Sequence, residues 1–364
     1  MGLTEELQQE AARLGLRLGA VPATTVFERG LDALQHRERE NWATPFVGGS
    51  IEVRCRPYAL FPGARTVIAV ARPWYIPAVG PPGPGEGLVA MSFRGEDYHR
   101  VLERLLVPLA ERLKDWGASW AVVQVDKGPL IEREAAFAAG LGYYGYNCSL
   151  MVPDMGSRVA LGLIITDLRL EATLPLKEPK CRECGRCLAA CPTGALVAPY
   201  TLHPGRCLSY LTQKRGFLPS DLRPYLGQRL FGCDVCQDVC PENEGLALRS
   251  GPSFVHPGLA DLLRLRGGRF RELFGTTALA WRGKTVLQRN AVVALVNTGY
   301  DGEEAVRELQ ELLLHPSPVL RGHAAWALGK LGAAEGRRAL ERAYGEEGDP
   351  LVREEIGRAL KGEG

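Results

Sequence analysis

The chain has 364 residues, which is long enough for two or three domains with separate hydrophobic cores. Apolar residues make up 46% and charged residues 24%, and the net charge is only +2, so a surface for nucleic acid would have to be a local patch. The N-terminal stretch "MGLTEELQQEAARLGLRLG" predicts an amphipathic helix with Leu3, Leu7, Ala11 and Leu14 on one face, and it lacks the features of an export signal. No apolar stretch approaches membrane-spanning length. We therefore expect a cytoplasmic protein whose ten cysteines stay reduced and available to metal.

Residues 1–175 alternate between short β-branched runs and a helical pattern. Strands are predicted for "RTVIAVARPWY" (65–75), "WAVVQVD" (120–126) and "SRVALGLIITDLRL" (157–170). The segment "YHRVLERLLVPLAERLKDW" (98–116) predicts a helix between the first two strands. Strands that alternate with helices indicate an α/β or mixed three-layer domain.

Residues 176–250 hold most of the cysteines and have no regular hydrophobic period, as expected where metal clusters replace an apolar core. The run "CRECGRCLAACP" has full ferredoxin spacing, whereas "CDVCQDVCP" has Leu230 where its first cysteine should stand. Zinc also accepts four thiolates, but two runs that end in C-x3-C-P favour iron–sulfur clusters. Because ferredoxins exchange the fourth ligand between runs, we predict one [4Fe–4S] cluster on Cys181, Cys184, Cys187 and Cys240.

The second predicted [4Fe–4S] cluster has Cys191, Cys233 and Cys236 and needs one further ligand. Cys207 lies between the two runs, on a segment long enough to fold back, and we predict that it is the displaced ligand. Free cysteines in the first 175 residues are expected to be small buried side chains instead. Two clusters held this close form a path for single electrons.

Residues 251–364 have a purely helical pattern that repeats. The repeated segments are "VLQRNAVVALVNTG" (286–299), "VLRGHAAWALGKLG" (319–332) and "LVREEIGRALKG" (351–362). Their spacing predicts stacked helix pairs in a HEAT-like solenoid, where each repeat buries the apolar face of its neighbour. A plain helical bundle is the alternative, and the aligned Ala-Leu pairs at 294–295, 327–328 and 359–360 favour the solenoid.

The chain resembles the bacterial epoxyqueuosine reductases along most of its length. The segments that carry the resemblance are "LFPGARTVIAVA", "RGEDYHRVL", "DKGPLIEREAAFAAGLGYYGYNCSL", "GSRVALGLIITDL", "CRECGRCLAACPTGALVAPYTLHPGRCLSYLT", "LRPYLGQRLFGCDVCQDVCPEN" and "FGTTALAWRGKTVLQRNAVVALVN". The family also completes its second cluster with a distant cysteine in this context, which supports Cys207 independently of the spacing. The resemblance implies a multidomain α+β protein, with an α/β cobalamin-binding domain at 1–175, a ferredoxin-like domain with two [4Fe–4S] clusters at 176–250, and all-α HEAT-like repeats at 251–364.

The resemblance also implies the reaction. Cobalamin reduced through the clusters would remove the epoxide oxygen of epoxyqueuosine at the wobble position of tRNA, in the last step of queuosine biosynthesis. An external electron donor would be required, and we expect the enzyme to be a monomer. The departing oxygen must be protonated, and the family's acid corresponds to Asp126. By position alone Asp126 would be an ordinary turn or capping residue, although the carboxyl end of a strand is where α/β sheets hold ligands.

Cobalamin is large, flat and mostly neutral, so its site needs apolar walls and close backbone approach more than charge. "YNCSLMVP" and "ALGLIITD" are candidates for these walls. The residues expected to contact cobalamin are Arg54, Tyr98, Asp126, Met151, Gly162, which would allow close approach to the corrin, and Ser209. Each of them has an ordinary packing role as the alternative.

Binding of tRNA requires Lys and Arg side chains that contact phosphates. The segment "RLRGGRFREL" places four arginines close together, and further cations follow at the entrance of the solenoid. A solvated helix face is the alternative for such a run. The residues expected to contact tRNA are Lys214, Arg215, Arg282, Lys284 and Arg289.

Two other functions are compatible with parts of this pattern. A reductive dehalogenase shares the cobalamin and two-cluster design, but such enzymes usually carry an export signal and do not need a HEAT-like tail. An electron-transfer or scaffold protein would have clusters and a solenoid, but it would leave Asp126 and the long N-terminal match unexplained.

Overall fold

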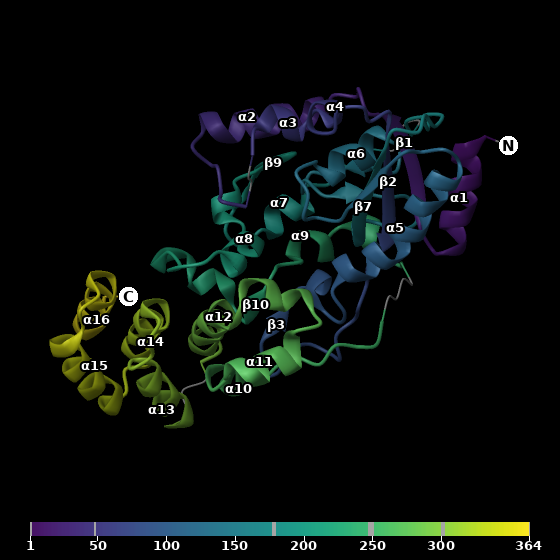
Figure 1. Cartoon of the computed structure of the whole chain (residues 1–364). Helices are drawn as coiled ribbons and strands as arrows, with labels where there is room; N and C mark the ends of the chain where they lie inside the picture. The colour runs from purple at the N-terminus through teal and green to yellow at the C-terminus, as the bar shows by residue number, and fades with distance from the viewer. Residues whose placement is uncertain (1, 47–48, 177–179, 247–250, 300–302, 364) are drawn as a thin grey trace. The chain divides into compact units, whose positions relative to one another are not determined.

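The computed structural model describes residues 2–46, 49–176, 180–246, 251–299 and 303–363 (Figure 1). The chain folds into two compact units, each assembled from separate segments. The first unit contains Met1–Tyr75, Glu96–Cys207 and Val235–Gly251, and the second contains Ile76–Gly95, Leu208–Asp234 and Pro252–Gly364. The three consecutive domains stay a prediction, and their second boundary, at residue 250, lies outside the described residues.

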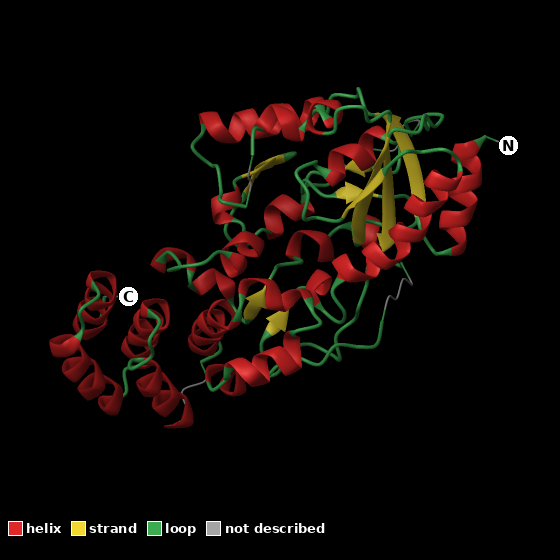
Figure 2. Ribbon diagram, viewed as in Figure 1, coloured by secondary structure: helices red, strands yellow, loops and turns green. Residues whose placement is uncertain are grey.

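The first unit is built on a four-stranded sheet (Figure 2). Its strands, in spatial order, are β1 (Arg17–Pro22), β2 (Thr66–Pro73), β7 (Val159–Thr166) and β4 (Ala121–Gln124). The three strands predicted from the sequence are confirmed. All neighbouring strands are antiparallel, so this sheet has no edge that collects the carboxyl ends of parallel strands. The ligand-binding edge expected for an α/β sheet is therefore not the reason for the position of Asp126.

Helices cover both faces of this sheet. Helix α5 (Tyr98–Asp115) packs on β4 and β7 and contacts α1 (Leu3–Arg13), while α6 (Glu132–Ala138) packs on β2 and β7. Because successive side chains of a strand point to opposite faces, Val67 and Ala69 of β2 share one face. Both lie in the core cluster that also contains Ala135 and Ala136 of α6. The sequence of β2 does not alternate between polar and apolar residues, because both faces of this strand are buried.

The N-terminal helix is shorter than predicted. Helix α1 ends at Arg13, Leu14 is 40% exposed, and Gly15 has a φ of +72°. That left-handed conformation favours glycine and turns the chain out of the helix. The "RLG" of the predicted helix then begins the edge strand β1.

Apart from α2, the remaining elements of the first unit are short. They are α2 (Glu28–Arg39), α3 (Ile51–Arg54), α4 (Pro57–Leu60), β5 (Tyr143–Tyr144), β6 (Leu150–Met151), α7 (Arg186–Ala190), β8 (Leu196–Ala198), β9 (Thr201–Leu202), η2 (Pro204–Arg206), α9 (Val235–Asp238) and η5 (Pro241–Asn243). Helices α7 and α9 contact each other and lie within the two cysteine runs.

The second unit is mainly helical, and its C-terminal part has the predicted repeats. These helices are α12 (Lys284–Asn297), α13 (Glu303–Leu312), α14 (Pro318–Leu331), α15 (Ala334–Glu346) and α16 (Pro350–Lys361). The three repeated segments correspond to α12, α14 and α16, which pack in that order. A Cβ added to Gly329 would lie 2.7 Å from the Cβ of Ala359, so the aligned small residues allow α14 and α16 to approach closely.

The rest of the second unit consists of β3 (Leu88–Val89), η1 (Met91–Phe93), α8 (Leu208–Gln213), η3 (Ser220–Leu222), η4 (Pro224–Leu226), β10 (Arg229–Phe231), α10 (Leu259–Leu263), α11 (Gly267–Phe274) and η6 (Ala278–Arg282). Of these elements, α8, η4, β10, α10 and η6 pack on α12. Leu230, which replaces the missing ferredoxin cysteine, is fully buried in β10 within the core of this unit. Across the described residues, the longest and most apolar helices still fall short of what a membrane span requires.

Candidate active site and cluster ligands

Asp126 lies in the tight turn that connects β4 to α6. Its φ is +52°, an uncommon conformation for a residue other than glycine. The buried side chain of Gln124 fills this turn, where its Nε2 donates hydrogen bonds to Leu130 O and to Glu132 Oε1. A Cβ on Gly128 would lie 2.0 Å from the Gln124 side chain, so the turn needs glycine there. The turn leaves 63% of the Asp126 side chain exposed, where it can meet a ligand.

The first turn of α5 brings two proton donors to Asp126. Tyr98 donates its hydroxyl hydrogen to Asp126 Oδ2 at 2.6 Å, and His99 Nε2 lies 3.6 Å from the same oxygen. Asp97 is the N-cap of α5 and accepts from the His99 backbone N–H at 3.0 Å. The same Asp97 oxygen lies 2.6 Å from His99 Nδ1 and fixes the orientation of the imidazole.

The charges of this network separate the pKa values of its members. Burial lowers the pKa of His99, but the contacts with Asp126 and Asp97 outweigh it and raise the pKa to about 9. Although its side chain is largely exposed, the surrounding protein desolvates Asp126 and raises its pKa, but the hydrogen bonds from His99 and Tyr98 hold that pKa below its usual value. Burial and the Asp126 charge raise the pKa of Tyr98. At neutral pH His99 is therefore an imidazolium, Asp126 a carboxylate and Tyr98 a neutral phenol, and both His99 and Tyr98 face Asp126 Oδ2.

Glu132 adds a second carboxyl group to the turn. Its Oε1 accepts from the Asp126 backbone N–H at 3.0 Å. Burial raises the pKa of Glu132 to about 7, with the Asp126 charge adding to the rise. Strongly shifted groups that surround one exposed carboxylate are typical of a catalytic site. Sequence reasoning missed Asp97, His99 and Glu132, although His99 directly follows Tyr98 in the quoted segment "RGEDYHRVL".

Arg54 contacts the same turn from the segment that follows α2. Its Nε donates to Pro129 O at 3.0 Å. Its Nη1 is buried and has no hydrogen-bond partner in the part of the chain that the structure describes, so it suits a polar group of a bound ligand. The sequence did not single out Arg37, whose pKa is lowered by burial and further by the charge of Arg133.

The other residues expected to contact cobalamin lie in different environments. Met151 is 2% exposed and pairs with Tyr143 in the β5–β6 hairpin. Gly162 does not have the role expected for it, because a Cβ there would lie 2.6 Å from the side chain of Leu106. Its small size therefore permits α5 to pack on β7, rather than the approach of a corrin. Ser209 belongs to the second unit, where its backbone O and its hydroxyl accept from Gln213 Nε2.

The four cysteines of the first predicted cluster lie together in the first unit. Burial raises the pKa of the Cys187 thiol, and the charges of Cys181 and Cys240 add to the rise. The pKa of Cys240 is raised by burial and by the charges of Cys181 and Cys184, among others. Cys181 is thus near enough to Cys187 and to Cys240 for its charge to act on both thiols, as expected for ligands of one cluster. Ion pairs of Arg182 with Glu242 at 2.7 Å and of Arg186 with Glu244 at 3.1 Å fasten the two runs together.

Three of the four residues of the second set also lie in the first unit. The segments of Cys191 and Cys207 are joined because Arg206 donates to Thr193 O at 2.7 and 2.9 Å, and Thr193 Oγ1 donates back to Arg206 O at 2.7 Å. Cys236 accepts a hydrogen bond at its backbone O from Asn147 Nδ2 at 3.2 Å. Cys233 belongs to the second unit. Cys55, which was expected to be an ordinary buried thiol, is fully buried.

Arg289 is not available to a phosphate, so its place among the tRNA contacts was wrong. The side chain is fully buried in α12. All of its guanidinium nitrogens donate to fixed oxygens, which are Asn290 Oδ1 and the carbonyls of Leu211, Thr212, Lys214 and Gly216. Arg289 therefore ties α12 to the end of α8, and the charge pattern alone did not reveal this burial.

The other predicted tRNA residues lie closer to solvent. Arg215 is exposed, while Lys214, Arg282 and Lys284 are half-buried. Lys214 Nζ donates to Phe217 O at 2.9 Å, and Lys284 Nζ donates to Gln288 Oε1 at 2.9 Å. Both of these partners are neutral, so neither hydrogen bond compensates the positive charge of the lysine.

Two arginines of the "RLRGGRFREL" segment have acidic partners. Arg264 forms ion pairs with Glu304 and Glu308, and Arg269 pairs with Glu272. This part of the segment is therefore a salt-bridged helix surface, which agrees with the solvated helix face given above as the alternative to tRNA binding.

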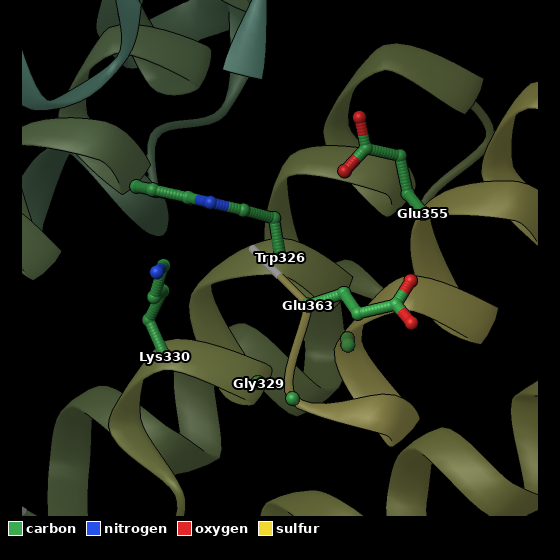
Figure 3. Close-up of a pocket in the computed structure, with 7 residues that line it drawn as sticks. Trp326, Gly329, Lys330, Glu355 and Glu363 are labelled. Atoms are coloured by element: carbon green, nitrogen blue, oxygen red, sulfur yellow. The ribbon is translucent and has the colours of Figure 1, made fainter. Parts of the chain in front are cut away.

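A small pocket lies among α14 and α16 (Figure 3). Its lining includes Trp326, Lys330, Glu355 and Glu363. Glu355 accepts two hydrogen bonds from the buried Arg223, at 2.5 and 3.0 Å. Two carboxylates at one small pocket are unfavourable for phosphate, so this pocket does not match a backbone-binding site for RNA.

Three family models match the chain. Residues 54–126 match a model described as epoxyqueuosine reductase QueG, DUF1730. Residues 180–243 match the 4Fe-4S double cluster binding domain, and residues 278–361 match HEAT repeats. The iron–sulfur and HEAT-like predictions are thereby confirmed.

Relatives are similar over nearly the whole chain. The epoxyqueuosine reductase of Bacillus subtilis is 37% identical over 372 residues, covering 99% of this chain and 95% of that protein. The enzyme of the same name from Bacillus cereus is 35% identical over 376 residues, covering 98% and 97%. Among solved structures, an epoxyqueuosine reductase with an epoxyqueuosine-modified stem loop of tyrosine tRNA has a TM-score of 0.92 and 36% identity, covering 99% of this chain and 98% of that chain.

Proposed function

The chain belongs to the epoxyqueuosine reductase family, and we propose that it reduces epoxyqueuosine to queuosine at the wobble position of tRNA. The observation that carries the proposal is the exposed Asp126 carboxylate with Tyr98 and His99 on the same oxygen. Loss of an epoxide oxygen as water consumes two electrons and two protons, and this network supplies protons at a position open to a ligand. The family assignment sets aside the reductive dehalogenase and the simple electron-transfer protein.

The electrons require the iron–sulfur domain. The proposed ligands of one [4Fe–4S] cluster are Cys181, Cys184, Cys187 and Cys240, and those of the other are Cys191, Cys207, Cys233 and Cys236. The effects of Cys181 and Cys240 on the pKa of Cys187, and of Cys181 and Cys184 on the pKa of Cys240, support the first set. The hydrogen bonds between the segments of Cys191 and Cys207 support their inclusion in one set.

We also propose that the first unit binds cobalamin, which supplies a strongly reducing cobalt centre when it is bound. Arg54 fits this role, because its buried Nη1 lacks a partner within the described chain and its Nε is bonded beside Asp126, at Pro129 O. Tyr98, Met151 and Asp126 remain proposed contacts, and so does Ser209. Gly162 is not included, because Leu106 occupies the space in front of it.

Asp126 is the proposed general acid, with His99 as its source of protons. In the unliganded protein the pKa of Asp126 lies below its usual value, so the mobile proton resides on His99. A substrate that covers Asp126 would remove solvent from the carboxylate and raise its pKa. Asp126 would then take the proton from the network and transfer it to the departing oxygen. The Tyr98 hydroxyl, 2.6 Å from Asp126 Oδ2, keeps the carboxylate oriented during this transfer.

The substrate RNA is proposed to contact Lys214, Arg215, Arg282 and Lys284 of the second unit. An external electron donor, a monomeric state and a cytoplasmic location complete the proposal. The test is mass spectrometry of nucleosides from tRNA of a strain that lacks the gene, complemented with wild-type or Asp126→Asn protein. Accumulated epoxyqueuosine that only the wild type converts supports the proposal. A strain with normal queuosine would overturn it.

A further inference from the structure

Trp281 is a large aromatic side chain that the fold holds at the surface of the second unit. It lies on η6, the short turn between α11 and α12, and it is 50% exposed. The turn is fixed on the N-terminal side of Trp281, because Ala278 and Leu279 are buried and Thr277 Oγ1 accepts from the Leu279 backbone N–H at 3.2 Å. A rigid turn that presents a tryptophan to solvent loses hydrophobic stabilisation, which favours a binding role over a packing role.

Arg282 lies over this indole. The central carbon of its guanidinium is 3.4 Å from the centroid of the Trp281 ring. This contact places a planar cation on an aromatic plane and forms an amphipathic surface. Proteins bind unpaired bases of RNA by stacking them on aromatic rings and guanidinium planes, because every base has a π-face.

The surroundings of the pair are positively charged. Burial lowers the pKa of Arg282, and the charge of Arg215 lowers it further. Burial also lowers the pKa of His315, and Lys284 is one of the two cations whose charges add to this effect. A cation whose pKa is lowered by a neighbouring positive charge lies in a positive potential, and bound phosphates would relieve this repulsion. By contrast, the ion pairs of Arg264 with Glu304 and Glu308 raise its pKa.

We propose that Trp281 and Arg282 form a stacking platform for one unpaired base of the substrate RNA, with Arg215 and Lys284 on the phosphates that flank this base. Phosphates alone would position the RNA without distinguishing a single-stranded loop from a duplex. A stacked base requires an unpaired nucleotide, so the platform gives the enzyme a preference for a loop. The identity of the RNA as an anticodon loop rests on the proposed function.

The test measures binding of an anticodon stem-loop RNA that carries epoxyqueuosine, at several salt concentrations. Trp281→Ala should weaken binding about 5- to 150-fold, the effect of losing one base stack. Its log–log salt slope should stay unchanged, because stacking releases no counterions. Trp281→Phe keeps an aromatic plane and should stay within a few-fold of wild type. Arg215→Gln should instead lower the slope by about 0.7, as expected for one single-strand phosphate contact.

Tyr344 provides a matched control, because it is 40% exposed and also lies under an arginine, Arg353, at 5.0 Å. Tyr344→Ala should leave RNA binding unchanged. The platform is refuted if Trp281→Ala binds like wild type, or if Trp281→Phe loses as much affinity as Trp281→Ala. If wild type converts the stem loop in either of these cases, the proposed function stands without the platform. If wild type neither binds nor converts the stem loop, both proposals fall.

Discussion

Asp126→Asn should stop proton delivery while it preserves the shape of the turn. The amide cannot carry a carboxylic proton, and it removes the charge that His99 Nε2 faces at 3.6 Å. The elevation of the His99 pKa from 6.5 to about 9 corresponds to about 3 kcal/mol in favour of the imidazolium, shared between Asp126 and Asp97. We therefore expect two linked effects: a lower His99 pKa and a slower chemical step.

Loss of a general acid typically costs about 10²–10⁴-fold in rate, which is about 3–5 kcal/mol of activation free energy. The assay is single-turnover conversion of an epoxyqueuosine stem loop, followed by mass spectrometry, with the His99 pKa measured by NMR. In the wild type the imidazolium is lost as pH rises through about 9, so the rate should fall there. In Asp126→Asn the residual rate should fall at a lower pH, because the pKa of His99 is lower.

Asp97→Asn is the matched control for this experiment. Asparagine is also a good N-cap, so α5 should begin normally, while the second carboxylate beside His99 loses its charge. This variant should lower the His99 pKa but retain the acid, and its turnover should fall less than that of Asp126→Asn. Near-normal turnover of Asp126→Asn, with intact iron content, would refute the reasoning and assign the proton to another group or to water.

Three further predictions concern the clusters, the solenoid and the pH dependence of stability. Cys207→Ser should lose or distort one cluster while Cys55→Ser retains both, as measured by iron content, and an unchanged iron count in Cys207→Ser would remove it from the ligand set. Arg289→Ala should lower the free energy of unfolding by about 3–5 kcal/mol, because it leaves buried carbonyls without donors, whereas Lys284→Ala should change the unfolding temperature little; equal effects would contradict the structural role of Arg289. The Glu132 pKa of about 7 means that the folded state holds this proton more tightly than the unfolded state, so stability should fall as pH rises from about 4.5 to 7. Glu132→Gln should remove this pH dependence, which amounts to at most about 3 kcal/mol in the free energy of unfolding measured with denaturant. An unchanged pH profile of stability in this variant would show that the Glu132 carboxyl has an ordinary pKa.

The sequence by itself determined the features that depend on spacing along the chain. Ferredoxin spacing predicted the iron–sulfur domain, because cluster ligands must recur at fixed short intervals. The repeated Ala-Leu pairs predicted the HEAT-like helices, because stacked repeats need small residues where helices approach one another. The strands around Val67, Val122 and Ile164 were also evident from their β-branched runs.

Tertiary structure decided everything that depends on which side chains meet. Asp126 and His99 are 27 positions apart in the sequence, and only the packing of α5 beside the β4 turn makes them one network. Arg289 and Arg282 look alike as cations in the sequence, yet carbonyls surround one of them and the indole of Trp281 lies under the other. Gly162 appeared to leave room for a ligand, but Leu106 fills that room. A sequence states which groups are present and at what spacing, whereas burial and partners arise from contacts between distant segments, and these contacts set the pKa values and the accessible charges.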